Sequence, residues 1–217
     1  MVRFKVLFTI LFACGISFQN YLSAQTSQNK KLVMIMDPGH GGRDSGAVGI
    51  NGIQEKDVVL KIAKQIVKLN NTIFKNRHEI YLTRYKDTLI YLGDRTRLAK
   101  TLKADLFLSL HCNFSENPNA RGVEVYVSEK QDKYSRKSIL FAYGIQNTLR
   151  KHLGIERRGV KFEDFQVLRE TANYCPSALL ELGFLSNWDE ADYFSKENNV
   201  KACSMLILTA LQNHLNF

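Results

Sequence analysis

The sequence predicts an α/β fold, in which a single domain holds a mostly parallel twisted sheet with helices on both faces. Short apolar runs alternate along the chain with amphipathic helical patterns, without an internal repeat or a low-complexity tract. Such alternation is typical of parallel strands that are covered on both faces. The length of 217 residues suits one compact domain with a substantial core.

The first half of the pattern contains three strands and two helices. Residues 32–36 are a continuous apolar run, which predicts a buried strand that ends at the glycine-rich turn 37–42. Residues 56–69 carry apolar side chains at helical spacing and predict a helix, and residues 79–83 predict the next strand. A helix over residues 92–102 and a strand over residues 106–110 follow.

The second half continues this alternation. Residues 122–127 predict a strand, and residues 134–153 predict a long helix that ends at Gly154. Residues 165–169 and 178–184 are predicted to be the remaining strands, and residues 199–215 the last helix. Ligands of such sheets bind beyond the carboxyl ends of the strands. His40, His111 and Glu181 all lie at or near these ends, which favours one shared site.

The N-terminus predicts a secretory signal peptide over residues 1–24. A short basic stretch precedes an apolar run, and Leu22-Ser23-Ala24 resembles a cleavage site before Gln25. The alternatives are a retained N-terminal anchor and a lipoprotein signal that would use Cys14. No segment approaches the roughly 20 apolar residues of a transmembrane helix. We therefore expect an exported protein, periplasmic or extracellular at the cell wall, with a flexible lead-in over residues 25–31 and a catalytic domain over residues 32–217.

The charge favours an anionic partner. The formal net charge is +9, and removal of residues 1–24 leaves 28 Lys and Arg against 21 Asp and Glu, or +7. The cell wall or a membrane surface would fit this charge, and a solvated basic surface without a partner is the alternative. The basic residues are spread along the chain without a recognised nucleic-acid module, so we expect no nucleic-acid partner.

Cysteine usage predicts no disulfide framework. Cys112, Cys175 and Cys203 would remain after cleavage, an odd number without metal-type spacing. Cys112 follows His111 on a predicted strand, where neighbouring side chains point to opposite faces. We therefore expect Cys112 to be a small core residue.

Two histidines and a glutamate form a candidate metal site. His40 lies in the turn Asp37-Pro38-Gly39-His40-Gly41-Gly42, Glu55 heads the first predicted helix, and His111 closes an apolar strand. Two His and one Glu, with a fourth position for water, are the ligand set of a catalytic site with one Zn²⁺ ion. The alternatives are a turn histidine, a first-turn helix acid and a hydrogen-bonded core histidine. Asp37 would either fix the loop or orient the imidazole without binding the metal itself.

Glu181 is the candidate catalytic residue. It interrupts an apolar run, so its carboxylate should be partly buried, and burial raises the pKa of an acid towards neutrality as a general base requires. The alternative is a structural ion pair with Arg84 or Arg95. Metal-assisted hydrolysis would use zinc to activate water and Glu181 to pass its proton to a departing amine. Arg84, Arg95 and Asn113 are candidates for binding substrate carboxylates or carbonyls.

The sequence resembles the zinc-dependent N-acetylmuramoyl-L-alanine amidases of the Amidase_3 (AmiC-like) family over residues 32–215. Four blocks carry the resemblance, and four in this order are specific where one would be weak. They are Met36-Asp37-Pro38-Gly39-His40-Gly41-Gly42 with Asp44, Gly46 and Ala47, Gly52-Ile53-Gln54-Glu55-Lys56, Ser109-Leu110-His111-Cys112-Asn113, and Leu180-Glu181-Leu182-Gly183-Phe184-Leu185-Ser186-Asn187.

The resemblance implies that His40, Glu55 and His111 bind zinc and that Glu181 is catalytic. The implied reaction cuts the amide between the lactyl group of N-acetylmuramic acid and L-alanine in peptidoglycan, as in cell-wall remodelling and daughter-cell separation. Several family members carry a helical insertion that blocks the zinc. Here the interval 128–165 is predicted to hold one helix and a loop, so we expect no such plug. An activator protein is a further candidate partner.

Two other functions would share these features. Another zinc peptidoglycan hydrolase, such as a carboxypeptidase or a deacetylase, would use the same ligand set. A non-catalytic wall-binding regulator would keep the fold but usually lacks a ligand or the catalytic acid. All four positions are filled here, which favours an enzyme.

Overall fold

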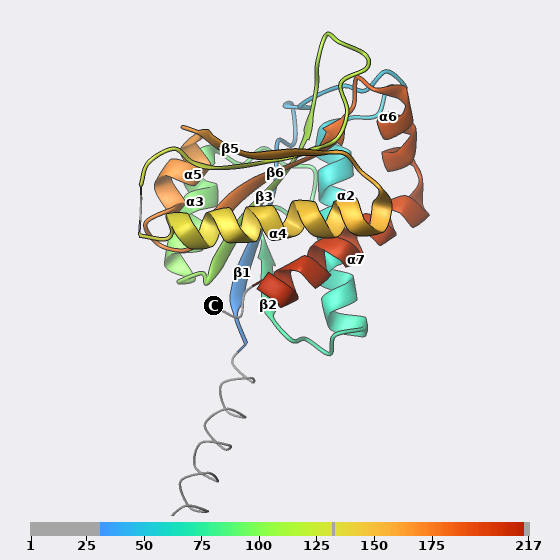
Figure 1. Cartoon of the computed structure of the whole chain (residues 1–217). Helices are drawn as coiled ribbons and strands as arrows, with labels where there is room; N and C mark the ends of the chain where they lie inside the picture. The colour runs from blue at the N-terminus through green and yellow to red at the C-terminus, as the bar shows by residue number, and fades with distance from the viewer. Residues whose placement is uncertain (1–30, 132, 215–217) are drawn as a thin grey trace, which may run out of the picture. The chain divides into compact units, whose positions relative to one another are not determined.

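Six strands form one mixed sheet in the order β2-β1-β3-β6-β4-β5 (Figure 1). The computed structural model of the chain describes residues 31–131 and 133–214. β1, β2, β3 and β6 run parallel, β4 is antiparallel to β6, and β5 is parallel to β4, so the sheet is mostly parallel as predicted. The strands are β1 (Val33–Pro38), β2 (Glu79–Leu82), β3 (Leu106–Asn113), β4 (Val123–Ser128), β5 (Arg157–Glu163) and β6 (Ser177–Phe184).

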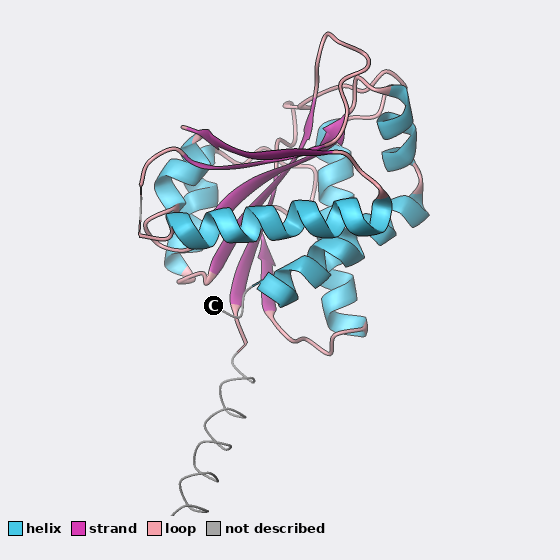
Figure 2. Cartoon of the chain, in the orientation of Figure 1, coloured by secondary structure: helices cyan, strands magenta, loops and turns pink. Residues whose placement is uncertain are grey.

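Helices cover both faces of the sheet, as the sequence predicted (Figure 2). One face packs against α2 (Glu55–Thr72), α4 (Ser135–Leu153) and α7 (Glu197–His214). The other face packs against the shorter α3 (Leu92–Thr101) and α5 (Gln166–Thr171). A further short helix, α6 (Trp188–Ser195), links β6 to α7.

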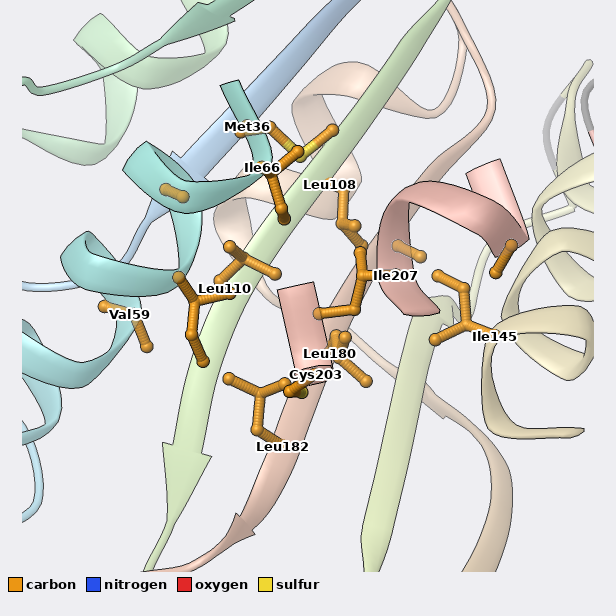
Figure 3. Packing of buried hydrophobic residues seen from close by; sticks show 14 of the residues in the cluster. Met36, Val59, Ile66, Leu108, Leu110, Ile145, Leu180, Leu182, Cys203 and Ile207 are labelled. Atoms are coloured by element: carbon orange, nitrogen blue, oxygen red, sulfur yellow. The ribbon is translucent and has the colours of Figure 1, made fainter. Parts of the chain in front are cut away.

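Alternating side chains of the central strands fill both helix–sheet interfaces. Met36 of β1 and Leu108 of β3 point into the larger cluster, where Figure 3 shows Leu108 close to Ile207 of α7. Ile35 and Phe107, one residue away on the same strands, point into the smaller cluster with α3 and α5. A fully buried side chain of this size contributes roughly 1.5–3 kcal/mol. Burial on both faces therefore explains the continuous apolar runs in the sequence.

The segment after α4 differs from the prediction. Residues 165–169 were expected to be a strand, but residues from 166 onward form α5, with Val167 and Leu168 on its buried side. The strand in this interval is instead β5, at the edge of the sheet. Charged residues occupy much of β5 and its side chains are only half-buried or exposed, so no apolar run marks it. The short helix α6 was also not predicted, although the Asn187 side chain caps it by accepting two backbone N–H bonds.

The predictions for the N-terminus fall outside the described residues. They concern the signal peptide over residues 1–24, the alternative lipoprotein site Cys14, and the lead-in over residues 25–31 apart from Lys31. In the part of the chain that the structure describes, no helix has the length and apolar character needed to cross a membrane.

His78 is a buried histidine that should make the stability of the fold depend on pH. Its backbone pairs with the side chain of Asn70, but neither ring nitrogen has a hydrogen-bond partner among the described residues. Burial, helped by the charge of Arg77, lowers the pKa of His78 below the ordinary 6.5. The unfolded chain therefore binds this proton more readily, so the stability that neutral His78 provides is complete above about pH 6.5 and is lost as the pH falls below it.

Replacement of His78 by Leu should reduce the loss of unfolding free energy between pH 7.5 and pH 5. Denaturant titrations at both pH values measure this loss. His152 is exposed on α4, so His152→Leu is the matched control and should leave the loss unchanged. An equal loss in wild type and His78→Leu would contradict the assignment.

Candidate metal centre

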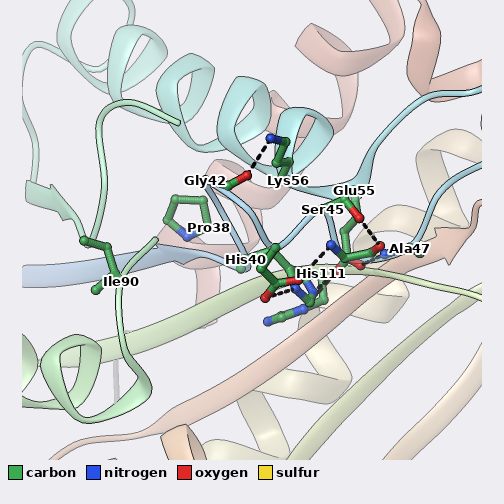
Figure 4. Close-up of polar contacts among 12 residues, drawn as sticks. Pro38, His40, Gly42, Ser45, Ala47, Glu55, Lys56, Ile90 and His111 are labelled. Atoms are coloured by element: carbon green, nitrogen blue, oxygen red, sulfur yellow. Dashed lines mark hydrogen bonds and ion pairs between the residues drawn. The ribbon is translucent and has the colours of Figure 1, made fainter. Parts of the chain in front are cut away.

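Three side chains from separate segments converge at the carboxyl ends of β1 and β3. His40 follows β1, Glu55 is the first residue of α2, and His111 lies near the end of β3. His40 Nε2 lies 3.1 Å from Glu55 Oε1, and His111 Nδ1 lies 2.9 Å from the same oxygen (Figure 4). One ligand atom from each residue can be chosen so that all lie within 4.8 Å of one another, which is close enough to hold one metal ion.

The turn after β1 presents the imidazole of His40. His40 adopts a left-handed backbone with φ of 57°, which costs on the order of 1 kcal/mol for a residue other than glycine. The backbone N–H of Gly41 donates to the carbonyl of Asp44 at 2.9 Å and closes the turn. The Asp44 carboxylate lies 2.9 Å from His40 Nδ1, which leaves Nε2 directed at Glu55. Asp44 thus orients the imidazole through its second ring nitrogen, as a neighbouring acid does for most metal-binding histidines.

Arg84 and Arg95 hold this turn through hydrogen bonds to its backbone carbonyls. Arg84 donates to the carbonyls of Pro38 at 3.0 Å and Gly39 at 2.7 Å, and Arg95 donates to the carbonyl of His40 at 2.8 Å. Both side chains are buried, each with 3% of its surface exposed. Both arginines were candidates for binding substrate. Arg84 donates to backbone carbonyls of the turn and of Lys56, whereas Arg95 also donates to the Asp37 carboxylate and lines the cavity beside the site. Neither forms the alternative ion pair with Glu181 in the described part of the chain.

Asp37 fixes the strand end, and among the described residues its carboxylate makes no hydrogen bond to an imidazole. Its carboxylate accepts hydrogen bonds from Thr83 at 2.6 Å, from Arg95 at 2.7 Å and from Ser109 at 2.8 Å. Of the two roles left open for Asp37, the structure shows the first. Asp44 takes the second, and its position four residues after His40 within the glycine-rich block was the available signal.

Glu55 is held as a carboxylate. Its Oε2 accepts from the backbone N–H of Ala47 at 2.7 Å, and its Oε1 accepts from that of Cys112 at 2.9 Å. Burial alone would raise the pKa of Glu55, but hydrogen bonds to His111 and His40 outweigh it and bring the pKa to about 2. Metal ligands must be deprotonated, so this residue is ready to bind a cation. Cys112 itself is buried in the core, as predicted.

Glycines leave the space that the ligand side chains occupy. A Cβ atom on Gly39 would lie 2.3 Å from His111 Cε1, and one on Gly46 would lie 2.4 Å from Glu55 Oε2. Two imidazoles, one ionised carboxylate and a cradle without side chains fit a zinc ion, which prefers nitrogen ligands and a carboxylate oxygen in catalytic sites. The residues present therefore suit the metal that the sequence predicts.

Gly39→Ala should weaken metal binding because the added methyl group must displace the imidazole of His111. Loss of ligand positioning typically lowers metal affinity by about 10–100-fold. Competition with a chelator of known affinity measures this change. Gly93→Ala is the matched control, since a Cβ atom there meets nothing within 4 Å. A Gly39→Ala protein with wild-type affinity would show that His111 does not need its present position.

Glu181 faces the same space from β6. It pairs in register with His111 of β3 on one side and with Glu124 of β4 on the other. Its Oε2 atom is buried and has no hydrogen-bond partner among the described residues. Burial raises the pKa of Glu181 to about 7, with the nearby charge of His111 opposing the rise. Glu181 is thus an unpaired acid beside the three candidate ligands.

Glu124 is a further buried acid near the site and was not among the residues predicted from the sequence. Its carboxylate pairs with Arg158, with Lys161 at 2.9 Å and with the hydroxyl of Tyr126 at 2.8 Å. Asn113, the third candidate for substrate binding, donates to Glu124 at 3.3 Å. Glu124 lies in the strand predicted over residues 122–127, and that prediction gave no sign of its ion pairs.

A cavity of about 510 Å³ opens beside these residues, and His40, His111 and Glu181 line it. One wall is the segment 89–92 before and at the start of α3, and the other includes Phe165 and Val167 at the start of α5. Its surface is mostly apolar. A few convergent polar groups in an apolar cavity are typical of a site for a small substrate segment.

Comparison with known proteins identifies the family. The N-acetylmuramoyl-L-alanine amidase family (Amidase_3) matches residues 33–213. The chain belongs to this family. It is similar to the endolysin of Bacillus phage SPP1, with 40% identity over 173 residues that make up 77% of this chain and 60% of the endolysin. It is also similar to the amidase LytC of Bacillus subtilis, with 37% identity over 73% of this chain and 30% of LytC.

A solved structure extends the likeness to the fold. The amidase AmiC2 of Nostoc punctiforme superposes with a TM-score of 0.78 at 29% identity, covering 87% of this chain and 99% of that structure. The chain therefore has an amidase fold with mostly parallel strands. It spans less than two thirds of either the endolysin or LytC.

Proposed function

We propose that this chain is a zinc-dependent amidase that cuts the amide between N-acetylmuramic acid and L-alanine in peptidoglycan. One observation carries the proposal. In a member of this amidase family, His40, Glu55 and His111 converge beside the carboxylate of Glu181, whose Oε2 has no partner among the described residues. His40, His111 and Glu181 also line one cavity. We assign His40, Glu55 and His111 as the metal ligands and Glu181 as the catalytic residue.

The proton path follows from the position of Glu181. A zinc ion bound by the three ligands would supply Lewis acidity that polarises the scissile carbonyl and acidifies an attacking water. In the part of the chain that the structure describes, no donor competes for Oε2 of Glu181, so this atom can accept the water proton directly. The same carboxyl can then donate that proton to the nitrogen of the departing L-alanine. Asp44, Arg84 and Arg95 hold His40 in place throughout, because their contacts are with its ring or its turn.

Analysis of digested peptidoglycan tests the reaction. The purified full chain with zinc is incubated with sacculi, and the products are separated by mass spectrometry. An amidase releases intact stem peptides with free L-alanine amino ends and leaves glycan strands without peptide. Release of D-alanine would indicate a carboxypeptidase, and release of acetate a deacetylase. No product at all, from protein that binds sacculi, would indicate a wall-binding regulator.

We also propose that this chain acts without an activator protein, in the periplasm or at the outer surface of an exporting cell. Between β4 and β6 the described residues hold α4, β5 and α5. Neither α4 nor β5 lines the cavity, and the start of α5 forms part of one wall. This arrangement supports a site that is open to substrate. Turnover by the purified chain alone supports the proposal, and a silent chain that a partner protein activates would refute it.

A further inference from the structure

A second hollow lies along α2, away from the metal centre. It has a volume of about 780 Å³ and lies between the later turns of α2 and the junction of α6 with α7. We call it the lysine groove. Its lining includes one acid, Glu197, an apolar group formed by Leu69, Ile73, Phe194 and Val200, and four lysines, Lys61, Lys64, Lys68 and Lys201.

The four lysines are exposed and have no ion pair or hydrogen bond from their side chains to any described residue. Elsewhere on the surface, lysines do pair with neighbouring acids, as Lys196 does with Asp192 at 2.6 Å. The lining of the groove therefore carries four positive charges against one negative charge. Like charges held this close repel one another unless an anion lies between them.

The lysines of α2 form a row. Lys61, Lys64 and Lys68 are three and four residues apart, so they share one face of the helix. At 1.5 Å per residue, the row extends about 10 Å along the helix axis. A concave site with a row of cations fits an extended chain with repeated negative charges better than it fits a flat membrane surface.

The same helix connects the groove to the metal centre. Glu55 is the first residue of α2, and Lys61 and Lys68 follow it by about 9 and 20 Å along the axis. Along this axis the groove therefore lies about 9 to 20 Å from Glu55. It opens beside α6 and α7, whereas the cavity at the metal centre has walls from the segments of α3 and α5, so a ligand must be long to reach both. Peptidoglycan is a long polymer, and its stem peptides carry free carboxylates at intervals along each strand.

We propose that the lysine groove binds carboxylates of stem peptides next to the one being cut. This inference rests on the proposed function, since peptidoglycan is the substrate it assumes. The groove would retain the enzyme on the sacculus between cuts and would contribute nothing to cleavage of a short soluble substrate. It would thus give part of the net positive charge of the chain an anionic partner at the cell wall.

Sedimentation with sacculi tests the groove. Binding is measured in a Glu181→Gln background, which keeps the sacculi undigested, with and without Lys61→Gln, Lys64→Gln and Lys68→Gln together. Three exposed contacts are expected to change affinity by about tenfold at low salt. The same substitutions to arginine keep the charge and should restore binding. Salt should weaken the wild-type interaction, because the Debye length is only about 8 Å at physiological ionic strength.

The matched control removes the same charge elsewhere. Lys130, Arg136 and Lys151 are exposed around α4, and their joint replacement by Gln should leave sacculus binding unchanged. Equal binding by the groove variant and this control would overturn the proposal. So would undiminished binding to sacculi whose carboxylates have been amidated, or binding that depends on phosphate polymers or on anionic lipid vesicles instead.

Activity on a soluble muramoyl peptide separates this inference from the proposed function. The groove variant with Glu181 intact should hydrolyse that substrate at the wild-type rate while it digests sacculi more slowly. Absence of hydrolysis by the wild type would refute the amidase proposal, whereas the sedimentation result would still decide the role of the groove. A groove variant impaired on both substrates to the same extent would overturn the groove proposal.

Discussion

Glu181→Gln is expected to lower kcat about 10³-fold while the protein still binds zinc, because the amide cannot accept the water proton. Hydrolysis of a soluble muramoyl peptide gives the rate, and elemental analysis gives the metal content. The loss should appear in kcat more than in KM, since Glu181 acts on the reacting atoms. Glu163→Gln, at an exposed acid of β5, is the matched control and should keep full activity.

The pH profile provides a second readout for Glu181. Burial raises the pKa of this carboxyl to about 7, and a bound cation would lower that pKa because positive charge favours the carboxylate. Wild-type kcat/KM should therefore rise with pH through an acid limb below pH 7. The residual activity of Glu181→Gln should lack this limb. A variant that retains both the rate and the limb would remove Glu181 from the mechanism.

His40→Ala is expected to weaken zinc binding by more than about 100-fold, since even loss of an outer partner of a ligand costs 10–100-fold. Activity at limiting zinc should fall with occupancy, and excess zinc should restore only part of it because the remaining two ligands hold the ion loosely. Chelator competition followed by kinetic assays at several zinc concentrations measures both effects.

The control for His40→Ala is another histidine of the same chain. His152 is exposed on α4 and lies outside the cavity lining, so His152→Ala should bind zinc as the wild type does. Chelator treatment of the wild type should abolish activity, and added zinc should restore it. Wild-type zinc affinity in His40→Ala would show that the three side chains do not form the metal site.

The sequence predicted that His40, His111 and Glu181 share one site because parallel strands deliver their carboxyl ends to one edge. Glu55 was expected to join them as the first residue of the helix that follows the His40 turn. It could not show how the turn around His40 is held. Arg84 and Arg95 were candidates for binding substrate, and their hydrogen bonds to the turn were not foreseen, because a sequence does not show which backbone carbonyls will surround a charged residue. Both arginines are buried because tertiary packing brings the turn after β1 against the segment after β2, which carries Arg84, and against the start of α3, which carries Arg95.

The strand order also explains which strands could be predicted from the sequence and which could not. β1, β3 and β6 are central and buried on both faces, so their apolar runs were visible in the sequence. β5 lies at an edge, where charged side chains reach solvent and only one neighbour supplies hydrogen bonds. Its position beside β4 brings Arg158 and Lys161 to Glu124, and no local pattern indicated that pairing.

Glu55 and His111 lie 56 residues apart in the sequence, and only the folded chain brings them together with His40. An ion that binds this set and not the unfolded chain shifts the folding equilibrium by mass action. Each tenfold rise of free zinc above its dissociation constant then adds about 1.4 kcal/mol to the free energy of unfolding. If zinc is the bound ion, as we propose, scarcity of this element would lower the thermodynamic stability of the fold together with the occupancy of the site.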